Sequence, residues 1–171
     1  MTTTAVKSAS FQKSGPNQEK AVFFLFEEDF VEENVRCIPM IVRFKLDACG
    51  IKLKLAEWVK FKPEEKEQLA VQSCGTKEET AAYKKYLQGL ILKRTGNKAT
   101  NLQTDEHPAW AELKSIIPEL EEKAKEFGWK ISTEQWMGLT SLQRFALLKL
   151  CRPGHENKNF PKAMKEFNLV K

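Results

Sequence analysis

The segment between Pro39 and Gly50 restricts the fold more than any other part of the chain. Pro39 suits the first turn of a helix, where its missing backbone N–H costs nothing, and Gly50 suits the left-handed residue that closes one. Between them the segment is apolar nearly all the way round, so it is expected to form a central helix covered on several sides. The apolar side chains that share one face of this helix are Met40, Ile41, Phe44 and Ala48.

Five charged side chains lie in or beside this apolar helix and form the candidate functional surface. They are Arg36, Arg43, Lys45, Asp47 and Lys52. The spacing of four residues between Arg43 and Asp47 allows an ion pair on one helix, and the spacing of seven places Arg36 and Arg43 on one face. Charges in a central helix must be paired or must line a surface that meets a partner. An internal ion pair is the first interpretation, a binding surface the second and catalysis the third.

Capping and breaking residues predict further helices along the chain. Thr76 and Glu79 form a capping-box pattern at the start of a long helix that Gly96 closes. Residues 51–55 are expected to be short and extended, and residues 97–104 to form a polar loop. Other helical segments are expected to start at Pro63, Pro108, Ser132, Thr140 and Pro161, with Pro118 breaking or kinking the one that begins at Pro108. The fold class predicted is mainly α, a single helical bundle over residues 21–171.

The beginning of the chain has a different character. Residues 1–20 are predicted to be a disordered tail, because residues 1–18 have no acidic and few apolar side chains to offset the entropy of ordering. A short organellar targeting peptide is the second interpretation, although the stretch lacks the arginine that such peptides normally carry. Residues 21–31, AVFFLFEEDFV, form either an extended segment lying on the core or a short strand, which periodicity does not separate.

A shift of 78 positions superposes two parts of the chain, with Gly50 falling on Gly128 and Trp58 on Trp136. The shared unit is a helix closed by glycine, an apolar–Lys–apolar step, a tryptophan turn and another helix. Glycine supplies a positive φ, and tryptophan fills the corner between helices. Further matches at this shift are Phe61 with Leu139, Lys66 with Arg144 and Leu69 with Leu147. We interpret the pattern as a duplication that gives two similar halves around one core, with chance similarity of two helical units as the alternative.

The charge and cysteine patterns exclude several classes of function. The net charge is +5, but lysines and glutamates alternate, as in KPEEKE at residues 62–67, whereas nucleic-acid binders gather positive charge on one face. Cys37, Cys49, Cys74 and Cys151 lack the paired spacing of a metal site and are expected to be reduced thiols. No apolar run approaches the length of a membrane span. We therefore expect a cytoplasmic protein without nucleic-acid, membrane or metal partners.

Catalytic motifs are also missing from the sequence. The glycines stand singly at helix ends instead of forming a phosphate-binding loop, and no nucleophile elbow is present. The expectation is that the chain is not an enzyme and carries no cofactor.

The segment FEEDFVEENVRCIPMIVRFKLDACGIKLKLAEWVKF, residues 26–61, resembles the signature region of the nitrate reductase-associated protein family of photosynthetic bacteria. Its specific parts are RCIPM, VRFKLD and CGIKL, and WMGLTSLQRFALLKL at residues 136–150 is similar as well. The resemblance covers roughly residues 21–170. It implies association with assimilatory nitrate reductase, and it assigns no catalytic residues that could be carried over to this chain.

Two hypotheses of function follow from the residues and the resemblance together. The first is a non-enzymatic accessory protein of nitrate reductase, docking through Arg36, Arg43, Lys45 and Asp47. The second is a binder or carrier of a small ligand, such as the molybdenum cofactor, since Arg and Lys on an apolar helix suit a phosphate-bearing ligand. A concave basic pocket around Arg36, Arg43 and Lys52 would favour this second hypothesis, and a flat surface would not.

Overall fold

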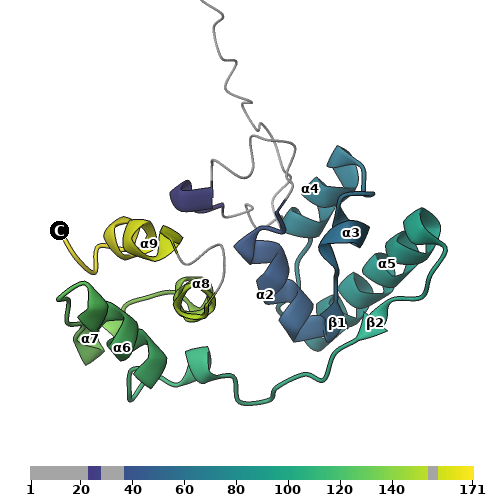
Figure 1. The fold of residues 1–171 in the computed structure, drawn as a ribbon. Coiled ribbons are helices and arrows are strands. Elements are labelled where there is room, and N and C mark those ends of the chain that lie inside the picture. Colours follow the sequence, from purple (N-terminus) through teal and green to yellow (C-terminus); the bar gives the residue numbers. More distant parts are fainter. Residues whose placement is uncertain (1–22, 28–36, 154–157) are drawn as a thin grey trace, which may run out of the picture.

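A computed structural model of the chain describes residues 23–27, 37–153 and 158–171 and confirms the mainly α class (Figure 1). The predicted disordered tail and Arg36 lie outside these residues. Two-residue strands β1 (Ile51–Lys52) and β2 (Thr100–Asn101) form an antiparallel pair. The helices are η1 (Leu25–Glu27), α2 (Met40–Cys49), α3 (Leu55–Trp58), α4 (Pro63–Val71), α5 (Lys77–Thr95), η2 (Ala109–Ala111), α6 (Pro118–Glu126), α7 (Thr133–Met137), α8 (Ser141–Cys151) and α9 (Phe160–Glu166), where η marks a 3-10 turn.

The predicted helix ends are confirmed by the backbone and by side-chain caps. Gly50 and Gly96 have φ of 71° and 74° and close α2 and α5. The Thr76 hydroxyl accepts the Glu79 N–H at the start of α5, and the hydroxyls of Ser132 and Thr140 do the same for α7 and α8. Pro39 directly precedes α2 instead of lying in its first turn.

Three local predictions differ from the structure in whole or in part. The helical stretch expected from Pro108 is reduced to η2, and the chain then runs without helix to Pro118, which starts α6 instead of breaking a helix. The polar loop over residues 97–104 contains β2. In the first aromatic segment, residues 25–27 form η1 and not an extended segment or a strand, but Phe24 and Phe26 are buried in the core, as one of the two alternatives expected.

The predicted repeat is present in the structure. Helices α2, α3 and α4 begin at residues 40, 55 and 63, and α6, α7 and α8 begin at residues 118, 133 and 141, each 78 residues later. Trp58 and Trp136 are both fully buried. The Lys66 Nζ lies 5.3 Å from the centre of the Trp58 ring, and the Arg144 Cζ lies 5.8 Å from that of Trp136. The two halves therefore share a tryptophan corner with a cation over its ring.

The buried side chains form two clusters instead of the single core expected. The first core surrounds Trp58 and lies within residues 42–91, and the second surrounds Trp136 and lies mostly within residues 117–169. Helix α2 belongs to both, because it packs on α5 of the first half and on α8 of the second (Figure 1). Val42 and Leu46 enter the first core, whereas Met40 enters the second. The prediction of a central helix is thus confirmed.

Hydrogen bonds to the carboxylates of Glu27 and Glu166 connect η1 to α2 and to α9. The buried Glu27 carboxylate accepts the Met40 N–H at 2.7 Å, where the dipole at the start of α2 favours an acid. The Glu166 carboxylate accepts the N–H groups of Leu25 and Phe26 at 2.8 and 3.1 Å. These contacts bring the start of the described chain onto the second half.

Replacing either corner tryptophan is expected to be strongly destabilising, because each fills a buried corner that alanine would leave empty. Trp58→Ala and Trp136→Ala should each lower the free energy of unfolding by about 3–5 kcal/mol, measured by urea denaturation followed by circular dichroism. Met137→Ala, at an exposed neighbouring position, should change it by about 0.5 kcal/mol or less. A tryptophan variant with the same urea midpoint as the wild type would contradict this assignment.

Candidate functional site

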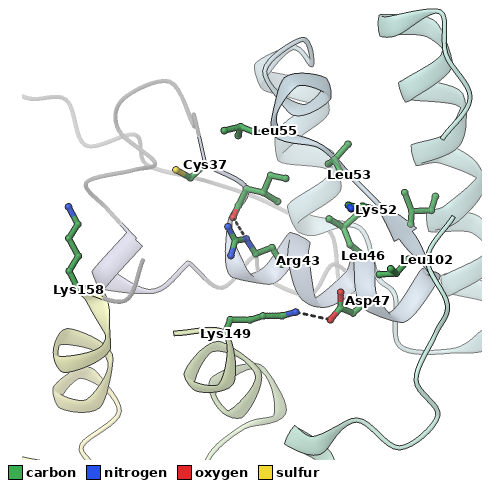
Figure 2. Close-up of a pocket in the computed structure, with 12 residues that line it drawn as sticks. Cys37, Arg43, Leu46, Asp47, Lys52, Leu53, Leu55, Leu102, Lys149 and Lys158 are labelled. Atoms are coloured by element: carbon green, nitrogen blue, oxygen red, sulfur yellow. Dashed lines mark hydrogen bonds and ion pairs between the residues drawn. The ribbon is translucent and has the colours of Figure 1, made fainter. Parts of the chain in front are cut away.

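A hollow of about 510 Å³ lies beside α2 and is bordered by both halves of the chain (Figure 2). Helix α2 and the residues just before it form one wall, and β1 with the start of α3 forms another. The second half adds one lysine from α8 and one that precedes α9. The lining residues are Cys37, Ile38, Arg43, Leu46, Asp47, Ile51, Lys52, Leu53, Leu55, Leu102, Lys149 and Lys158.

Helical spacing brings the polar side of α2 to the hollow. Arg43 and Asp47 are four residues apart, so both side chains lie on one face of the helix. The Arg43 Nε donates to the carbonyl of Ile38 at 3.1 Å. The Asp47 Oδ2 lies 3.3 Å from the Lys149 Nζ, so an ion pair connects α2 to α8 across the boundary between the halves (Figure 2). This ion pair is therefore a contact between the two halves at the hollow.

Gly50 fixes the other end of the hollow. Its φ of 71° turns the chain from α2 into β1, and a Cβ added there would lie 2.7 Å from the carbonyl oxygen of Leu102. The Leu102 N–H donates to the Gly50 carbonyl at 2.8 Å. A close backbone approach that only glycine allows thus places the Leu102 side chain at the edge of the hollow.

Three of the five predicted surface residues, Arg43, Asp47 and Lys52, line this hollow. Arg36 lies outside the described residues. Lys45 was wrongly assigned to the surface, because its side chain is buried and its Nζ donates to the carbonyls of Ala70 and Gln72, both at 2.7 Å. These carbonyls end α4, where the negative pole of the helix favours a cation.

Lys149, Lys158, Leu55 and Leu102 were missed as site residues by sequence reasoning. Lys149 could have been predicted, because it is a charged residue in the otherwise apolar segment FALLKL. The same feature marked Arg43 in α2 as a candidate. The other three reach the hollow through long-range packing that no local pattern reveals.

Burial controls the chemistry of three cysteine thiols. It raises the pKa of Cys49 to about 11 and that of Cys151 to about 12, and it also raises the pKa of Cys74. These groups stay protonated at neutral pH, and a thiol is a much weaker nucleophile than a thiolate. Within the described ranges, no cluster of His, Cys, Asp and Glu is arranged to hold a metal ion. No helix in that part of the chain has the length and apolar character needed to cross a bilayer.

Comparison with known proteins identifies a matching family. The family model described as conserved nitrate reductase-associated protein matches residues 23–167, which include every described residue that lines the hollow. No curated protein matches the chain, and no solved structure does.

The buried position of Lys45 leads to a stability prediction. Lys45→Met keeps the apolar stem but removes the ammonium that binds the two carbonyls at the end of α4, so it should lower the free energy of unfolding by about 2 kcal/mol. Lys52→Met, at an exposed position, should change it by about 0.5 kcal/mol or less. Thermal denaturation of both variants measures the difference, and equal melting temperatures would rule out the capping role of Lys45.

Proposed function

The chain belongs to the conserved nitrate reductase-associated protein family, and we propose from this that it is a non-enzymatic accessory protein of assimilatory nitrate reductase. In this role it helps the reductase to mature or to work through direct protein contact. The family match is the observation that carries the proposal, because the family description names an association with the reductase.

The hollow beside α2 supports a role in contact. Lys52 and Leu55 border it and are both exposed, so a charged and an apolar side chain are presented together at one edge. Interface anatomy combines apolar contact with polar groups at the rim in this way.

A second candidate function is favoured by the cations that line the hollow. Arg43, Lys52, Lys149 and Lys158 line the hollow together with apolar side chains, a combination that also suits a small anionic ligand such as the molybdenum cofactor. Purification of the chain from cells that make the reductase, followed by mass spectrometry under native conditions, would distinguish the two. A bound small anion that is lost in Lys52→Glu would favour the carrier function over the contact function.

Charge reversal at the hollow tests the contact function. Lys52→Glu combined with Lys158→Glu should weaken binding of purified nitrate reductase from the same organism by about tenfold or more. In this variant, glutamates would face the acidic groups of the reductase that the lysines are expected to meet. Biolayer interferometry with the immobilised full chain measures this change.

Lys130→Glu provides the matched control. Lys130 is exposed, lies 78 positions after Lys52 in the second half, and does not line the hollow. Combined with Lys125→Glu, at another exposed lysine that does not line the hollow, its reversal changes the net charge as much as the double hollow variant does, yet it should leave binding at the wild-type level. Equal binding by the hollow variant and the control would show that the reductase does not meet this surface, and no binding by the wild type would remove the accessory function itself.

A further inference from the structure

Apolar side chains stand exposed on two sides of the hollow. Leu55, at the start of α3, is 52% exposed, and Leu102, just after β2, is 43% exposed. Leu46 and Leu53 lie between them in the lining and are buried. Covering two exposed leucines removes apolar surface from water, which is worth about 25 cal/mol for each Å² covered. The hollow therefore has an apolar lining, and a partner that covers the exposed leucines at its edges would remove the most apolar surface from water.

Cationic side chains from different elements border this apolar lining. Lys52 is exposed on β1, and its ammonium has no ion pair among the residues that the structure describes. Lys149 approaches from α8, and its partner Asp47 keeps 44% of its side chain exposed, so this pair stays open to solvent (Figure 2). A carboxylate of a partner would be stabilised by the ammonium of Lys52. A carboxylate near Lys149 would share the Lys149 ammonium with Asp47.

The open shape of the hollow favours a piece of a macromolecule over a small molecule. Small-ligand sites generally bury most of the ligand surface. Here the two leucines that border the hollow are about half exposed, so a small ligand on the floor would leave much of their surface in water. A peptide segment is long enough to reach both edges at once.

From this arrangement we infer that the hollow receives a short segment of nitrate reductase in which an apolar side chain is flanked by carboxylates. The apolar side chain lies between Leu55 and Leu102, and a carboxylate meets Lys52. This inference rests on the proposed function, since it names the part of the partner that the hollow contacts.

Site-specific photo-crosslinking tests the inference. A benzophenone amino acid is placed at position 55 or 102 of the full chain, which is then mixed with purified nitrate reductase and irradiated. Position 137 is the matched control, because Met137 is 55% exposed on α7, the counterpart of α3 in the second half, and does not line the hollow. Crosslinked peptides of the reductase are identified by mass spectrometry.

Positions 55 and 102 should both crosslink to one short reductase stretch that carries at least two carboxylates and an apolar residue. The control position should give a yield about tenfold lower, and adding Lys52→Glu should reduce the yield at 55 and 102 by a similar factor. Crosslinks to a stretch without acids, to a second copy of this chain or to a small molecule would overturn the inference. So would the absence of crosslinks from both positions while binding of the reductase persists, and that result would leave the proposed function standing. If the unmodified chain does not bind nitrate reductase at all, both the inference and the proposed function are overturned.

Discussion

The fold depends on helix α2, which contributes side chains to both hydrophobic cores. Helix α2 is apolar nearly all round because Val42 and Leu46 pack into the first core while Met40 packs into the second. Packing on two sides leaves only a narrow strip of the helix for polar groups. Arg43 and Asp47 occupy that strip, and it faces the hollow. The same constraint that joins the two halves therefore also decides where this helix can present charge.

The repeat explains how each half is built but not how the site arises. Both halves use a glycine at positive φ and a buried tryptophan under a cation, with helices that begin 78 residues apart. The positions of Arg43 and Asp47, by contrast, correspond to Glu121 and Lys125 in the second half, so the charges are reversed there. The hollow also needs Lys149 from the second half. It is a product of the way the two units meet, and neither unit repeats it.

Local signals in the sequence predicted most of the helices, because caps such as Thr76 and left-handed glycines such as Gly50 act within a few residues. The failures involve contacts between distant residues. The pairing of β1 with β2 joins segments about 50 residues apart, and Lys45 is drawn inward by carbonyls 25 and 27 residues away. For the site, a charge in an apolar helix was the right signal, but the sequence could not distinguish Arg43, which lines the hollow, from Lys45, which caps α4.

Hydrogen–deuterium exchange of the chain with and without nitrate reductase tests the central claim most directly, because it finds the contact surface without altering any residue. The account predicts slower amide exchange in the complex over residues 51–55, 102–104 and 149–152, because each of these segments contains at least one residue that lines the hollow. Residues 129–133, at the counterpart of β1 in the second half, should exchange at the same rate in both states. Protection confined to other surfaces, such as the outer face of α5, with these three segments unchanged, would contradict it.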